Sequence, residues 1–111
     1  MHNLCMAHGN KSDRDSIAAT SGRRIVAARK AREWSQEALA EATGWTAAQP
    51  SQAQPNALSP SRIANFEQGT RRVGVEEAAI LSRVLGFPPP YWMGVISEQE
   101  AAVIETLRKT A

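Results

Sequence analysis

Apolar and polar residues alternate with helical spacing over five stretches of this chain. Each stretch is bounded by residue types that favour the start or the end of a helix. We therefore expect an all-α fold, a compact bundle of about five helices packed around one core. The predicted helices cover residues 22–33, 35–44, 59–69, 75–85 and 97–110, with an aromatic turn at 87–93.

The stretch 59–69, SPSRIANFEQG, carries the most information about function. Ser59 is a favoured N-cap, and Gly69 is a residue that commonly ends a helix. Helical spacing places Glu67 and the large apolar side chains on one face, with Arg62 on the flank. A face of short polar groups could read base edges in DNA, although an ordinary amphipathic surface helix can have the same pattern. The residues on that face are Ser61, Ala64, Asn65 and Gln68.

Two charged residues are expected to face the core. In the helix predicted at 22–33, Arg29 lies on the same side as Ile25, and Glu67 points inward from the later helix. A buried carboxylate or guanidinium without a partner is costly. We therefore predict a structural ion pair between Arg29 and Glu67 that joins the two helices, the alternative being two unrelated exposed charges.

The helix predicted at 35–44 begins at Ser35, a favoured N-cap, and ends at Gly44. Gln36 lies at its amino end, where an amide side chain and free backbone N–H groups could hold a phosphate. A solvated residue in the first turn would show the same pattern.

Residues 45–58 form an inserted loop with two prolines, three glutamines and no charge. Trp45 is expected to pack behind Gly44. The loop could contact DNA or a protein partner, or it could be a tolerated surface insertion, because long loops cost little closure entropy.

The two ends of the chain differ in character. Residues 1–21 are poor in large apolar groups, which predicts a flexible N-terminal tail. The possible zinc ligands His2, Cys5 and His8 lie there, but a structural site needs four ligands, so we expect no metal.

Residues 97–111 form a C-terminal helix whose apolar stripe favours packing within the chain over a dimer seam. The stripe consists of Val103, Ile104 and Leu107.

The net charge of +2 is unevenly distributed. Residues 22–72 carry eight basic and four acidic groups, whereas residues 73–111 carry three basic and five acidic groups. This basic segment also contains the helix predicted at 59–69, which is the candidate for reading DNA. The coincidence favours a polyanionic partner. The sequence has no recognisable secretory leader or membrane-spanning stretch, and its lone cysteine excludes an internal disulfide, so we expect a cytoplasmic protein without membrane contact.

The sequence does not favour an enzyme. Both histidines lie in the predicted tail, so the folded part offers no imidazole base. No nucleophile elbow, phosphate-cradling glycine loop or metal constellation is present in the sequence, and we expect no cofactor.

Three blocks in order, ARKAREWSQEALAEATG, SPSRIANFEQGTRR and EEAAILSRVLG, resemble the lambda-repressor-like helix-turn-helix domain of Xre/Cro-type DNA-binding regulators. The resemblance covers residues 22–96 and implies that the helix at 59–69 lies in the major groove. It also implies that Arg29 pairs with Glu67. The residues implied to face bases are Ser61, Arg62, Ala64 and Asn65, and those implied to hold phosphates are Gln36, Arg71 and Arg72.

One departure from the family pattern is the distance between the two motif helices. The turn is longer than usual by about a dozen residues. We expect a sequence-specific double-stranded DNA-binding transcriptional regulator, a repressor that acts as a homodimer on DNA. The alternative is an antitoxin-like DNA-binding protein whose main partner is another protein, held through the 45–58 loop or the C-terminal helix.

Overall fold

The chain is described by a computed structural model, which covers residues 9–48 and 56–110. Over these residues all regular structure is helical, so the expected all-α fold is confirmed. The middle of the 45–58 loop and the residues His2, Cys5 and His8 lie outside the described part. The helices are α2 (Gly9–Ala31), α3 (Gln36–Ala42), α4 (Pro60–Gln68), α5 (Val75–Leu85), α6 (Pro89–Trp92) and α7 (Glu98–Thr110).

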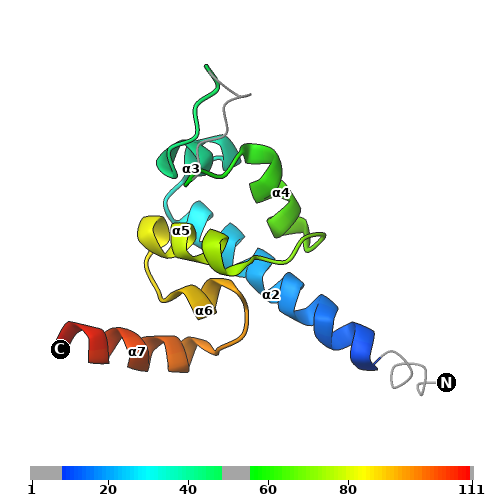
Figure 1. Cartoon of the computed structure of the whole chain (residues 1–111), viewed down its shortest axis with the longest axis vertical. Helices are drawn as coiled ribbons and strands as arrows, with labels where there is room; N and C mark the ends of the chain where they lie inside the picture. The colour runs from blue at the N-terminus through cyan, green and yellow to red at the C-terminus, as the bar shows by residue number, and fades with distance from the viewer. Residues whose placement is uncertain (1–8, 49–55, 111) are drawn as a thin grey trace.

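The long helix α2 connects the two ends of the bundle (Figure 1). At one end α4 packs against both α2 and α3. At the other end α6 packs against α2 and α5, and α7 packs against α6. Helices α4 and α7 therefore lie on opposite sides of the molecule in Figure 1.

Local capping explains where the helices begin and end. The hydroxyls of Ser35 and Ser59 accept the backbone N–H groups of the residues three positions later, which starts α3 and α4. Gly69 ends α4 in the left-handed conformation, with φ of 76°. Ser97 and Glu100 exchange side-chain and backbone hydrogen bonds of 3.0 and 2.7 Å at the start of α7, the capping box expected from their spacing.

The flexible tail expected over residues 1–21 is wrong from Gly9 onward, because α2 begins there. Small residues let this helix approach its neighbours closely. Ser21 is 1% exposed, and a Cβ atom on Gly22 would lie 2.6 Å from the carbonyl oxygen of Phe66. A Cβ atom on Gly94 would lie 2.7 Å from the Ile17 carbonyl. Small residues such as Ser21 and Gly22 pack closely without producing a repeating pattern of large apolar side chains. The sequence therefore has no helix signal there, and its polar composition predicted a tail.

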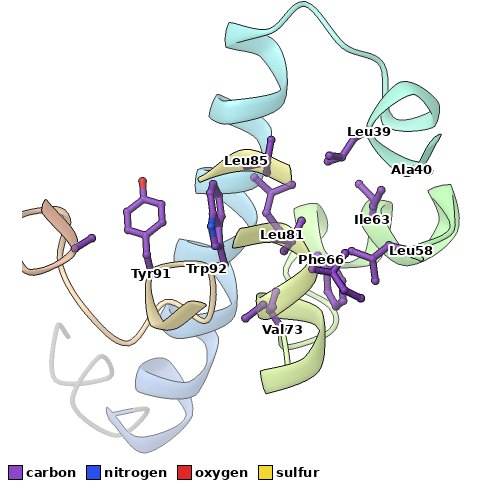
Figure 2. Close-up of a cluster of buried hydrophobic side chains, with 14 residues drawn as sticks. Leu39, Ala40, Leu58, Ile63, Phe66, Val73, Leu81, Leu85, Tyr91 and Trp92 are labelled. Atoms are coloured by element: carbon purple, nitrogen blue, oxygen red, sulfur yellow. The ribbon is translucent and has the colours of Figure 1, made fainter. Parts of the chain in front are cut away.

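The core joins side chains from every helix (Figure 2). Ile63 and Phe66 of α4 are fully buried and point into the cluster that also holds Leu39, Leu58 and Leu81. This burial is the main stabilising contribution available to a chain of this size. The predicted inner face of the reading helix is therefore the face that packs against the protein.

The expected aromatic turn contains the short helix α6. The indole N–H of Trp92 donates to the carbonyl of Gly86 at 2.6 Å. Arg24 of α2 lies over the Tyr91 ring, 4.2 Å from its centroid, and donates to the carbonyls of Tyr91 and Ile96 at 2.8 and 2.9 Å. Burial raises the pKa of the Tyr91 hydroxyl, with Arg24 acting in the opposite direction. These contacts fasten the segment leading to α7 onto α2.

The apolar stripe of α7 does not pack within the described chain, so that expectation is wrong. Ala101 is the residue of α7 that is buried against the body. Val103, Ile104 and Leu107 are 57%, 38% and 63% exposed. Because α7 packs on the body through Ala101, its larger side chains Val103 and Leu107 project away from the body.

Candidate nucleic-acid interface

Helix α4 has one face in the core and one face in solvent. Ile63 and Phe66 are fully buried. On the opposite side Ser61, Arg62 and Asn65 are exposed, and Ala64 is half-buried between them. The four residues predicted to face bases therefore form one accessible strip along a nine-residue helix. Hydroxyl, guanidinium, methyl and amide groups in such a strip match the donors, acceptors and methyl groups at base edges.

A network of charged and amide groups fixes the buried side of α4. Arg29 meets Glu67 through two parallel hydrogen bonds, Nε to Oε2 at 2.8 Å and Nη2 to Oε1 at 3.0 Å. The two side chains are 13% and 6% exposed. The hydrogen bonds that Arg29 donates to Glu67 raise the pKa of Arg29 above its ordinary value, and burial opposes this effect. The structure thus brings together the two charges that the helix faces place inside.

The same network includes Gln36, for which a phosphate contact was expected. Its side-chain amide donates to Oε1 of Glu67 at 2.9 Å. Arg29 also donates to the carbonyl of Trp34 at 2.9 Å, just before α3 begins. Glu67 therefore ties α4 to both α2 and α3, and one of the two amide N–H donors of Gln36 is used inside the protein.

Basic side chains gather on the α5 side of the exposed strip, and one of them, Arg62, belongs to the strip itself. Glu77 lies between two of them, 3.4 Å from Nη1 of Arg62 and 3.5 Å from Nη2 of Arg71. Both arginine side chains are about half exposed, at 45% and 51%, and Arg72 beside them is exposed as well. Ion pairs this long and this exposed are weak, so the guanidinium groups can exchange the carboxylate for a phosphate.

Glu77 is held in place by the protein rather than by the arginines. Its Oε1 accepts the backbone N–H of Gly74 at 2.8 Å, at the start of α5. The spacing of Glu77 after Gly74 is that of a first-turn residue of α5, but the sequence does not show that it lies between Arg62 and Arg71. The capping spacing was visible, whereas the proximity of α4 to the start of α5 was not.

The inserted loop begins and ends at the same place. The buried hydroxyl of Thr43 accepts the N–H of Leu58 at 2.8 Å and donates to the carbonyl of Ala40 at 2.6 Å. Arg83 of α5 donates to the carbonyls of Thr43 and Asn56, at 3.4 and 3.2 Å. These bonds close the enlarged turn at its base and tie the end of α3 to the residues just before α4.

Two further properties concern the described residues alone. Among them, no cluster of three or more His, Cys, Asp or Glu side chains is arranged to hold a metal ion. None of the helices that the structure describes combines the length and the apolar character needed to cross a bilayer.

Comparison with known proteins assigns the family. A model of the helix-turn-helix domain matches residues 22–90, which include α3, the enlarged turn and α4. No curated protein and no solved structure gives a significant match. Because the matched region covers more than half of the chain, and α3 and α4 have the two-helix arrangement described above, this protein belongs to the helix-turn-helix domain family, a family of DNA-binding domains.

Proposed function

We propose that this protein is a sequence-specific regulator of transcription of the Xre/Cro type, which binds double-stranded DNA through the exposed strip of α4 and acts as a repressor. The observation that carries this proposal is the division of α4 into two faces. Glu67 is locked to Arg29 and Gln36 on one side, while short polar groups are accessible on the other. A helix held this rigidly can present its outer side chains to a groove in one register.

Each residue of the strip has a proposed partner. Asn65 pairs with adenine through its amide donor and acceptor, and Arg62 reads guanine or holds a phosphate. Ser61 supplies a hydroxyl, and Ala64 offers a methyl contact to thymine. Contacts to the sugar-phosphate backbone come from Arg71, Arg72 and the remaining N–H donor of Gln36, and these fix the register of the protein on the duplex.

One copy of so small a module buries limited surface on DNA. We propose that two copies bind two-fold related half-sites about one helical turn apart, as a homodimer on its operator. Two copies that bind adjacent half-sites together would bind DNA more tightly than one copy can alone.

Two substitutions separate base reading from phosphate binding. Selection from random duplexes should first define a palindromic consensus. On that site, Asn65→Ala should cost about 1–3 kcal/mol of binding free energy at one base position, whereas Arg71→Ala should weaken consensus and random duplexes alike. Affinities are measured by fluorescence anisotropy at fixed salt. Val95→Ala, which shortens a side chain that is 52% exposed between α6 and α7 and lies outside the strip, serves as the control and should bind like the original chain.

The contradicting outcomes are specific. If Asn65→Ala and Arg71→Ala lose the same affinity on consensus and random DNA, Asn65 does not read a base. If selection enriches no sequence, the DNA-reading proposal is wrong.

A second candidate function is favoured by the exposed apolar stripe of α7. In an antitoxin-like protein, DNA binding would accompany a tight complex with another protein, docked on α7 or on the 45–58 loop. Co-purification of one stoichiometric partner from the native host would support this candidate over the free repressor.

A further inference from the structure

The two carboxylate oxygens of Glu77 contact different groups. Oε1 accepts the backbone N–H of Gly74 at 2.8 Å, at the start of α5. Oε2 lies 3.4 Å from Nη1 of Arg62 and 3.5 Å from Nη2 of Arg71. One anionic oxygen therefore lies between a guanidinium group from α4 and a second one from the turn that follows α4.

The carboxylate is held more firmly than the two arginines that meet it. The Glu77 side chain is 14% exposed, and its hydrogen bond to Gly74 anchors it at the start of α5. Arg62 and Arg71 are 45% and 51% exposed, and long exposed side chains keep much of their rotamer freedom. When another anion approaches, the guanidinium groups can therefore turn toward it while the carboxylate stays in place.

A DNA phosphate offers the same kind of acceptor as Oε2 of Glu77. Both are anionic oxygens, and arginine donates to either in charge-assisted hydrogen bonds. A guanidinium group that binds a phosphate must first leave the carboxylate. The free energy of each phosphate contact is then reduced by that of the ion pair that it replaces.

We propose that Glu77 is a built-in competitor for DNA phosphates. It holds Arg62 and Arg71 beside the exposed strip in the free protein and lowers the affinity for DNA of any sequence. This role rests on the DNA binding proposed above and adds to it a residue that sets affinity. Because phosphate contacts carry no base sequence, the competition weakens random and consensus duplexes alike, and discrimination stays with the base-facing residues.

Glu77→Gln tests the competition. The substitution removes the charge and keeps a side-chain oxygen that can accept the Gly74 N–H. It should strengthen binding to consensus and random duplexes by about fivefold, because two exposed ion pairs worth about two- to threefold each no longer have to be broken. Fluorescence anisotropy at low, fixed salt measures the affinities. Damage to the fold would weaken binding, so it cannot produce this gain.

Glu76→Gln is the matched control. Glu76 precedes Glu77 in the first turn of α5 and is exposed, but it lines a hollow with Arg83 and pairs with neither arginine of the strip side. The control removes the same charge from the same turn without releasing a guanidinium group. Its affinity for either duplex should rise less than about twofold.

A third chain separates the release of arginines from the loss of a repulsive charge. In a chain that carries Arg62→Ala and Arg71→Ala, Glu77 has no guanidinium group of the pair left to hold. Adding Glu77→Gln to that chain should then raise the affinity no more than Glu76→Gln raises it in the original chain. Both measurements use the random duplex at low salt, where weak binding is still measurable.

Three results would overturn the proposal. They are equal gains for Glu77→Gln and Glu76→Gln, a gain that persists in full without Arg62 and Arg71, and a gain confined to the consensus duplex. All three require that the original chain binds DNA. An original chain that binds neither duplex contradicts the proposed function itself, so the two failures are distinguishable.

Discussion

Glu67 connects α4 to two other helices. It accepts hydrogen bonds from Arg29 on α2 and from Gln36 on α3, and its side chain is 6% exposed. Such a pair adds little net stability compared with apolar residues, but removing one partner leaves the other charge buried and unpaired. The network therefore acts mainly as a constraint on how α4 can lie.

Glu67→Gln should lower the free energy of unfolding by about 3–5 kcal/mol, because the Arg29 guanidinium loses its buried counter-charge. Urea denaturation followed by circular dichroism measures this loss. Glu77→Gln makes the same chemical change where the arginine partners are half exposed, and it should cost less than about 1 kcal/mol. Equal costs for the two variants would show that Glu67 has no special constraining role.

For single residues, the sequence can predict a contact between two charged side chains when helical spacing directs both of them into the core. Helical spacing places Arg29 and Glu67 inside, and desolvation then requires that they meet. The same reasoning fails for Gln36, whose amide binds Glu67, because a polar residue at the start of a helix can face either water or protein. Thr43 and Arg83 were missed for a related reason, since their partners lie on a loop of unpredictable course.

At the scale of the elements, the enlarged turn joins α3 to α4. Its two ends are closed by the Thr43 hydroxyl, which is 3% exposed and bonds to the N–H of Leu58. Arg83 adds a connection from α5 to the same place. This closure holds the end of α3 beside the start of α4, and a long loop between two points held together costs little closure entropy.

Thr43→Val should destabilise the fold by about 1–3 kcal/mol, because it keeps the shape of the side chain but leaves the buried N–H of Leu58 without an acceptor. Thermal and urea unfolding measure the change. Thr70→Val removes an exposed hydroxyl that donates to the carbonyl of Asn65, and it should change stability far less. If the two variants behave alike, the closure at Thr43 contributes nothing particular to the fold.

Element boundaries were predictable where capping residues are present. Ser35, Ser59, Gly69 and Ser97 each bound a helix in the structure as they do in the sequence. The first half of α2 was not predictable, because Ser21 and Gly22 pack through small surfaces that leave no apolar stripe. The direction of the α7 stripe was hidden too, since a stripe alone does not say what covers it.

Across the whole molecule, three exposed arginines lie on α4 and in the turn that follows it, namely Arg62, Arg71 and Arg72. Residues 22–72 have four more basic than acidic groups, whereas the remainder up to the C-terminus has an excess of acid. Exposed positive charge beside the strip favours the approach of a polyanion from the α4 side.

Binding should depend steeply on salt. If each of two copies neutralises about three phosphates, the logarithm of the binding constant should fall with the logarithm of salt concentration with a slope of roughly −5. Arg72→Ala should make that slope shallower by about 1 for each copy bound. Titrations at several salt concentrations measure both slopes. A slope near zero for the original chain would exclude binding through phosphate contacts.

The placement of α4 and α7 on opposite sides of the molecule has an evolutionary consequence (Figure 1). After gene duplication, substitutions in the exposed strip could change the chemistry of that surface while α7 stays as it is. Substitutions in the exposed stripe of α7 could likewise leave the strip intact. The two surfaces can therefore diverge in separate steps, neither of which needs to disturb the core.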